Sequence, residues 1–346
     1  MFIESEKTII KSIEKYVEPY HSISIIGMAK NAGKTTVLNT IISAHKTKRL
    51  AISSVGLDGE EIDTITNQNK PRIQVYPGMI IATTKECLDQ STITYVIHEN
   101  TNIRTALGTV VICEVIRAGL ILVAGPSSRN KMKKLKSIIT KYEPYKILFD
   151  GALFRKSIAS RELVDGIIFV TGASYSSNID KVINDTKITI DHYSIKAVEQ
   201  SLKINVKTNE NNIIIFENKA IKTVTKDNII DKEHILEQFL TEETRVLYLP
   251  RSLNEKIVEV ILSNKNKLTQ FKIIVQDATY ILLKPQTLAK LSKIGIKISV
   301  LNPIDIIFVA YNPISPYGYS FDNNEFKSKL RAAIGFEPIN VLQDLE

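Results

Sequence analysis

The sequence predicts an α/β protein: a mostly parallel sheet covered by helices, followed by a smaller C-terminal α/β domain. Short β-branched apolar segments alternate with amphipathic segments along most of the chain, as strands and their covering helices do. A glycine-bounded turn joins the first of these strands to the helix that follows it. The length of 346 residues corresponds to roughly two domains of about 150 residues each.

The larger expected domain covers residues 1–198. Its first elements are a helix at 4–17, a strand at 22–26, a helix at 35–46 and a strand at 50–55. Short strands with no helix between them follow at 73–76, 79–84, 94–98, 109–116 and 120–125. We expect these strands to form an antiparallel or mixed insertion. The last elements are a helix at 127–141, strands at 146–150 and 166–172, and a helix at 178–198.

The composition changes near residue 199, where we place the domain boundary. Residues 201–228 are polar, strand-like and rich in turn residues. Alternation then resumes, with strands at 246–250, 271–276, 297–302 and 306–313 and helices at 252–264, 286–295 and 325–335. The last helix ends at a glycine, a common stop signal. Residues 199–346 are therefore expected to form a C-terminal α/β domain for partner or substrate interaction.

Composition excludes several kinds of site. Cys87 and Cys113 are the only cysteines, too few for a disulfide scaffold or a cysteine-rich metal site. The net charge of +8 comes from scattered lysines rather than a basic block interleaved with aromatic residues, so we expect no nucleic-acid partner. No window of about 18 residues lacks charge, and the N-terminus has no apolar signal-peptide centre. We therefore expect no membrane partner and a cytoplasmic location.

The sharpest chemical feature is the segment GMAKNAGKTT, residues 27–36, between an apolar strand and an apolar-periodic helix. Such a loop presents backbone N–H groups, and the helix N-terminus adds partial positive charge, so a polyphosphate can be cradled there. Gly33 lets the backbone approach a phosphate, Lys34 can reach the β- and γ-phosphates, and the Thr35 hydroxyl can ligate Mg²⁺. We predict a P-loop NTPase that uses Mg²⁺ and ATP; no guanine-specific motif is evident, although GTP stays open. The expected nucleotide contacts are Gly27, Lys30, Asn31, Ala32, Gly33, Lys34, Thr35 and Thr36.

The loop is one residue longer than the common G-x-x-x-x-G-K-[ST] form, because five residues separate Gly27 from Gly33. In this respect it resembles the loop of dethiobiotin synthetase and related amidotransferase-like synthetases. These belong to the P-loop class that includes MinD-type and signal-recognition NTPases. Some members carry a signature lysine early in the loop. Lys30 lies four residues before Lys34, one fewer than in that signature, so we assign Lys30 no trans-acting role.

Magnesium on a nucleotide favours carboxylates at strand ends. Asp150 ends the apolar strand KILFD and is expected to serve the metal, with helix capping as the alternative. Asp58 follows strand 50–55 and is expected to reach the metal or position water, with an Asp-Gly turn as the alternative. Lys34, Asp58 and Asp150 are thus the predicted catalytic residues, and Thr35, Asp58 and Asp150 the predicted metal ligands. Glu114, within an apolar strand, is either a further acid of the site or a solvent-facing side chain.

Three further loops follow strands, where ligands bind in open α/β sheets. Residues 125–128 (GPSS) and 172–177 (GASYSS) are candidates to hold the base or a second substrate, although caps and turns explain them as well. Residues 311–319 (YNPISPYGY) form either a binding surface or a packed aromatic turn. Arg155 either stabilises phosphate charge or forms a surface ion pair.

Several stretches together resemble one narrower family, the P-loop subunit of the reactivase for adenosylcobalamin-dependent lysine 5,6-aminomutase. Only the phosphate loop among them is specific by mechanism; the stretches are 27–39, 55–63, 70–84, 122–128, 149–160, 170–174 and 311–321. The resemblance implies an ATP-driven protein that acts with a second reactivase subunit on a cobalamin-dependent aminomutase and drives exchange of damaged cofactor. It also implies that Gly33, Lys34 and Thr35 hold the nucleotide while Asp58 and Asp150 serve magnesium.

Two other functions stay open at this point. One is a dethiobiotin-synthetase-like ATP-dependent ligase or kinase that acts on a small carboxylate. The other is a nucleotide-sensing interaction module without catalysis. Residues 199–346 favour the reactivase, because a minimal synthetase of this class would not need them.

Overall fold

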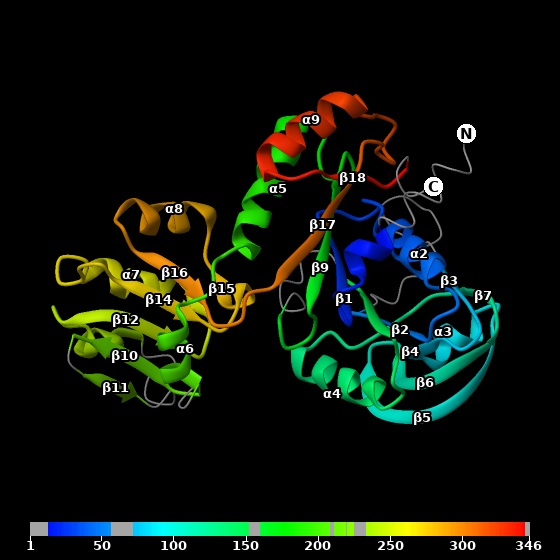
Figure 1. Ribbon diagram of the computed structural model, residues 1–346, viewed down its shortest axis with the longest axis horizontal. Helices are drawn as coiled ribbons and strands as arrows, with labels where there is room; N and C mark the ends of the chain where they lie inside the picture. Colours follow the sequence, from blue (N-terminus) through cyan, green and yellow to red (C-terminus); the bar gives the residue numbers. More distant parts are fainter. Residues whose placement is uncertain are drawn as a thin grey trace. The chain divides into compact units, whose positions relative to one another are not determined.

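The computed structural model describes residues 13–56, 72–151, 160–207, 211–218, 220–224 and 233–342 (Figure 1). The chain divides into two compact units. The first combines Met1–Ile190 with Asp305–Glu346, and the second is Asp191–Ile304. Each unit has its own sheet and is described separately.

The first unit is built on a nine-stranded sheet in the order β18-β17-β9-β1-β8-β2-β4-β6-β5. The strands from β18 to β4 are all parallel, whereas β6 and β5 are antiparallel to their neighbours. In chain order the strands are Ser22–Gly27 (β1), Leu50–Ser54 (β2), Ile80–Thr84 (β4), Thr94–Thr105 (β5), Gly108–Arg117 (β6), Lys146–Asp150 (β8), Gly166–Gly172 (β9), Asp305–Asn312 (β17) and Ile339–Asn340 (β18). The predicted α/β class with a mostly parallel sheet is confirmed. The mixed pairing expected for residues 73–125 is found as well, but a short helix, Lys85–Asp89, lies between β4 and β5, where no helix was expected. A separate antiparallel pair joins β3 (Ile73–Val75) to β7 (Gly119–Ile121).

Helices of the first unit bury one apolar stripe each. They are Lys34–Ala44 (α2), Lys85–Asp89 (α3), Arg129–Thr140 (α4), Ile179–Tyr193 (α5), whose last residues enter the second unit, and Asn323–Ile334 (α9). Helix α2 buries Val37, Leu38, Ile41 and Ile42, the spacing of one face of a helix. Helix α4 contacts β4 and β5 and begins at Ser128, whose side chain caps the backbone N–H of Lys131.

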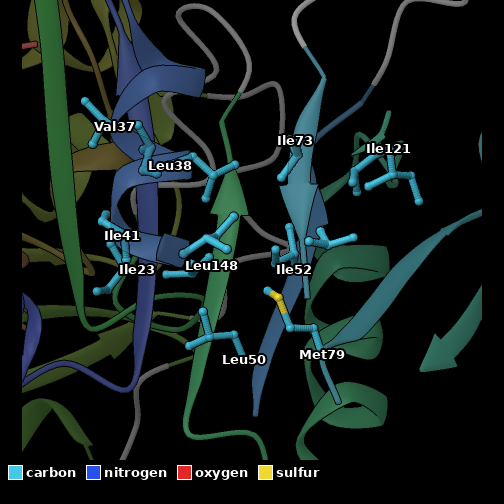
Figure 2. Packing of buried hydrophobic residues seen from close by; sticks show 14 of the residues in the cluster. Ile23, Val37, Leu38, Ile41, Leu50, Ile52, Ile73, Met79, Ile121 and Leu148 are labelled. Atoms are coloured by element: carbon cyan, nitrogen blue, oxygen red, sulfur yellow. The ribbon is translucent and has the colours of Figure 1, made fainter. Parts of the chain in front are cut away.

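Strand residues alternate between the two faces of this sheet, so neighbouring positions enter different layers of the core. Ile23 of β1, Ile52 of β2 and Leu148 of β8 are fully buried in the cluster that packs against α2. Figure 2 shows Ile23 near Ile41 of the helix and Leu148 near Leu38, with Ile52 farther from the helix, near Met79. Each such aliphatic side chain contributes about 1.5–3 kcal/mol when removed from water, so this layer fixes where α2 begins relative to β1.

The second unit has a five-stranded sheet in the order β11-β10-β12-β14-β16. Strands β12, β14 and β16 are parallel, and β10 is antiparallel to both β11 and β12. In chain order the strands are Ile213–Glu217 (β10), Ile221–Val224 (β11), Thr244–Leu249 (β12), Lys272–Val275 (β14) and Lys297–Val300 (β16). The α-helices described within Asp191–Ile304 that begin after α5 are Gln200–Lys207 (α6), Glu255–Ser263 (α7) and Pro285–Lys293 (α8). Two 3₁₀ segments, Glu233–Phe239 and Ala278–Tyr280, and a short pair, β13 (Leu253–Asn254) with β15 (Ile281–Leu282), complete the unit.

The division of the chain differs from the expected domains 1–198 and 199–346. Residues from Asp305 onward return to the first unit, because β17 pairs in parallel with β9, with Ala310 opposite Val170. The second unit is therefore inserted between α5 and β17. Residues 200–207 are also helical, where we expected polar strand-like chain, because burial of Val206 and Leu202 against the sheet favours a helix there.

No helix in the described part of the chain is both long and apolar enough to cross a membrane.

Candidate functional site

The loop between β1 and α2 contains two residues in the left-handed conformation just before the helix. Strand β1 ends at Gly27, and α2 begins at Lys34 directly after Gly33, whose φ of 104° lies in the left-handed region. Asn31 also has a positive φ, 57°. The N–H of Met28 donates to the carbonyl oxygen of Val170 on β9 at 2.9 Å, which anchors the start of the loop. Left-handed residues before a helix N-terminus turn successive N–H groups toward one side, the arrangement that binds phosphate.

Lys34 folds back over this loop. Its Nζ donates to the carbonyl oxygen of Ala29 at 2.9 Å. A Cβ added at Gly27 would lie 2.9 Å from both Cδ and Nζ of Lys34, so a side chain at position 27 would displace the lysine from this position. Burial lowers the pKa of the Lys34 ammonium, and the charge of Asp150 acts in the opposite direction. The lysine is thus partly buried, with its Nζ held at the loop by the carbonyl oxygen of Ala29.

Asp150 lies at the end of the neighbouring strand β8, in register with Ile25 of β1. Its Oδ1 atom is buried and has no hydrogen-bond partner among the described residues. Burial raises the pKa of this carboxyl, and the nearby Lys34 lowers it in part. The next residue, Gly151, donates its N–H to the carbonyl oxygen of Ile25 at 2.9 Å, and a Cβ there would meet that oxygen at 2.3 Å. The close backbone contact places the carboxylate at the same end of the sheet as the loop between β1 and α2.

These residues fit a metal–polyphosphate group by their chemistry. A buried carboxylate oxygen without a partner is costly unless a cation or donor satisfies it. Mg²⁺ takes oxygen ligands, and Asp150 and the partly exposed Thr35 offer a carboxylate and a hydroxyl. The first turn of α2 contains no acidic residue, and among the described residues no side chain caps its N-terminus, so an external anion could bind its N–H groups. The site can therefore hold a cation beside a phosphate.

The loop containing residues 125–128 packs against the end of β2. A Cβ on Gly125 would lie 1.8 Å from the carbonyl oxygen of Ser54, and the carbonyl oxygen of Gly125 accepts from the N–H of Gly56 at 3.1 Å. Ser128 serves as the N-cap of α4. Turn and cap geometry thus accounts for this loop without a ligand. Thr84 at the end of β4 is a further residue of this edge, and its buried Oγ1 is unpartnered within the described residues.

The loop containing residues 172–177 lies on the other side of β1. The N–H of Ala173 donates to the carbonyl oxygen of Asn312 on β17 at 2.9 Å, and the Tyr319 hydroxyl donates to that of Ala173 at 2.7 Å. The Ser174 hydroxyl oxygen is buried and makes no hydrogen bond to any described residue. Tyr175 donates to Asp185 of α5 at 2.9 Å. Backbone and aromatic contacts fix this loop. The Ser174 hydroxyl, which has no hydrogen-bond partner among the described residues, follows β9, the strand that accepts the hydrogen bond from Met28.

Residues 311–319 form a packed aromatic turn. Ser315 donates its N–H to the carbonyl oxygen of Tyr319 at 2.9 Å, which closes the turn around Gly318 at a φ of 85°. Phe321, at the foot of the turn, meets Phe326 of α9 edge-on at 5.1 Å between ring centroids. The turn nevertheless exposes Ile314 and Tyr317. The backbone hydrogen bond and the ring contact explain the shape of the turn, and its exposed side chains leave the alternative of a binding surface untested.

Other predicted residues lie elsewhere. Glu114 is opposite Ile80, at the start of β4, and so at the edge of the sheet away from the phosphate loop. It accepts from Arg49 at 3.2 Å and contacts His98 at 3.1 Å, which makes it a partly exposed ion-pair residue instead of a further acid of the site. Asp58 and Arg155 lie outside the described residues.

Lys30, by contrast, is in the loop and is exposed. The structure thus brings together Gly27, Lys30, Asn31, Ala32, Gly33, Lys34, Thr35 and Thr36 in one loop, with Asp150 beside it. The sequence did not single out Thr84 or Ser174 within their segments. It also gave no sign of Val341, which packs against Gly33. In the described part of the chain, no three His, Cys, Asp or Glu side chains gather as a metal cluster.

Comparison with known proteins gives no match to a family model, a curated protein or a solved structure.

Proposed function

We propose that this protein binds ATP with Mg²⁺ at the loop between β1 and α2 and hydrolyses it. The observation that carries the proposal is the placement of Lys34 and Asp150. They are a partly buried cation and a partly buried anion, the latter with a buried Oδ1, beside a glycine-rich loop at a helix N-terminus. Such a constellation is costly in an empty fold and is relieved by a bound phosphate and metal.

In this proposal the loop residues have separate roles. The backbone of Gly27, Lys30, Asn31, Ala32 and Gly33 holds the phosphates, with Lys34 and Thr36 at the start of the helix. Thr35 and Asp150 serve the metal, and Asp58 is proposed as a further ligand from the segment after β2. When bound, Mg²⁺ neutralises phosphate charge that develops during transfer. Lys34 supplies a fixed positive charge in a site of low dielectric, where it acts more strongly than in water.

We further propose that the ATPase acts with a second reactivase subunit on a cobalamin-dependent aminomutase and drives exchange of damaged cofactor. The resemblance in the stretches around residues 27–39 and 311–321 supports this part. Chain connectivity is compatible with it. The chain passes into the second unit near the end of α5 and returns to the first unit at the start of β17. Helix α5 starts just after the loop that contains Ser174, and β17 ends at Asn312. A nucleotide can shift a conformational equilibrium only through different affinity for its two states.

The test is a reactivation assay with the full chain. An inactivated aminomutase is incubated with the protein, its partner subunit, ATP, Mg²⁺ and fresh cofactor. Recovery of turnover that requires ATP hydrolysis supports the reactivase. Phosphorylation of a small carboxylate without recovery favours the ligase or kinase. Nucleotide binding with neither outcome favours a sensing module.

A further inference from the structure

The C-terminal segment Ile339–Leu342 lies directly against the phosphate loop. A Cβ on Gly33 would lie 3.0 Å from Cγ2 and 3.3 Å from Cγ1 of Val341, so the valine fills the space where a side chain at position 33 would stand. Val341 is fully buried and belongs to the same core cluster as Ala32. The loop conformation that offers its N–H groups to a ligand is therefore supported from behind by a residue far away in the sequence.

Hydrogen bonds hold this segment in place at successive residues. The N–H of Val341 donates to the carbonyl oxygen of Tyr311 on β17 at 2.9 Å. The buried Asn340 donates from Nδ2 to Oδ1 of Asn323, at the start of α9, at 2.7 Å. Leu342 donates its N–H to Oδ1 of Asn340 at 2.8 Å. These bonds fix Val341 relative to β17 and α9, so Gly33 is packed against a rigid part of the fold.

We propose that Val341 is a positioning residue for nucleotide binding and that docking of Ile339–Leu342 and occupancy of the phosphate loop stabilise each other. This inference rests on the proposed nucleotide function and adds a regulatory element to it. The physical reason is that Gly33 lies in a left-handed conformation at an uncapped helix start, which the loop alone holds poorly. A group that fixes this conformation before binding lowers the ordering cost of the bound state. Thermodynamic linkage then requires that bound nucleotide favour the docked form of Ile339–Leu342 by the same factor by which docking favours nucleotide binding.

The first arm of the test compares two buried valines of the same core cluster. Val341→Ala removes the contact with Gly33, whereas Val115→Ala creates a similar cavity in β6, away from the loop. We expect Val341→Ala to raise the Kd for Mg²⁺–ATP about fivefold or more, the low end of typical coupling between sites. Val115→Ala should change it by less than about twofold. Equal changes in the two folded variants would overturn the proposal.

The second arm uses the wild-type protein and needs no folded variant. Amide hydrogen exchange is measured with and without a non-hydrolysable ATP analogue and Mg²⁺. The amides of Val341 and Leu342 should exchange more slowly with nucleotide, while the amide of Val115, which donates to Met79, should not. Unchanged exchange at Val341 in a nucleotide-saturated protein refutes the coupling alone. Absence of any nucleotide binding by the wild type refutes the proposed function and, with it, this inference.

Discussion

Lys34 has two partners in the described fold, the carbonyl oxygen of Ala29 and the charge of Asp150. Burial lowers the pKa of its ammonium, so the fold by itself does not favour the charged form of this lysine. We predict that Lys34→Ala lowers the rate of ATP hydrolysis roughly 100-fold or more, as loss of one charge-stabilising donor does in other enzymes. Lys46→Ala, at an exposed position in the turn after α2, is the matched control and should keep the wild-type rate. Phosphate release measures both, and an unchanged rate in the Lys34 variant would place the chemistry elsewhere.

The raised pKa of Asp150 predicts how Mg²⁺ binding depends on pH. Mg²⁺ coordinates the ionised carboxylate, so its contribution to nucleotide affinity is present above this raised pKa and is lost as pH falls through it. The effect of this raised pKa on the stability of the free protein has the opposite dependence on pH. A folded-state pKa above the unfolded value stabilises the fold below the unfolded pKa, and this contribution is lost as pH rises through the folded pKa. The Mg²⁺-dependent gain in ATP affinity, measured by calorimetry across pH, should therefore begin to fall at higher pH than an ordinary aspartate would give. Asp150→Asn should show little Mg²⁺-dependent gain at any pH, and a full gain in that variant would contradict the role of Asp150.

Single residues of the site were predictable to different degrees. Gly33, Lys34 and Asp150 follow from local patterns, because a glycine turn before a helix and an acid after an apolar strand are readable in the chain itself. Val341 was not predictable, since its contact with Gly33 depends on parallel pairing of β18 with β17. The buried hydroxyl of Ser174 carries no pattern of its own.

At the scale of elements, the loop around Gly125 contacts residues near the ends of both β2 and β4. The backbone of Gly125 meets Ser54 so closely that no side chain fits, and the N–H of Ala124 donates to Oγ1 of Thr83 at 2.9 Å. We predict that Gly125→Ala lowers the free energy of unfolding by about 1–3 kcal/mol, because the loop must move away from β2. Ser127→Ala, at an exposed position of the same loop, should stay within about 0.5 kcal/mol of wild type. Urea denaturation tests both, and equal stability of the two variants would show that the loop adapts without strain.

Most elements were predictable because their apolar periodicity matches the layers they enter. Strand β8 reads as a continuous apolar run and is buried on both faces, and α2 shows the stripe it packs against β1. Helix α6 was the main error. Its sequence, QSLKINVK, has few apolar residues and a polar neighbourhood, and the buried contacts of Leu202 and Val206 decide its conformation.

At the scale of the whole molecule, the second unit is a continuous segment inserted into the first. It has its own five-stranded sheet and its own buried cluster around Ile273 and Leu247. We predict that residues 191–304 alone fold and unfold cooperatively, without nucleotide affinity. Residues 199–346 should fold less well, because β17, α9 and β18 lose their partners in the first sheet. Circular dichroism during heating compares the fragments, and a cooperative transition only in 199–346 would contradict this division.

The sequence alone could not show that insertion. Alternation of strands and helices continues without a break through residue 305, and pairing of β17 with β9 is not local in the sequence. The change of composition near residue 199 lies close to the first crossing at 190–191, whereas nothing marks the return at 304–305.

The central claim is that the loop from Gly27 to Thr36 binds a nucleoside triphosphate with magnesium. Isothermal titration calorimetry of the full chain with ATP, in the presence and absence of Mg²⁺, tests it most directly. We predict saturable binding of one nucleotide per chain that is strengthened by Mg²⁺ and lost in Lys34→Ala. The absence of binding by every nucleoside triphosphate in the presence of Mg²⁺, in a protein shown to be folded, would contradict the account.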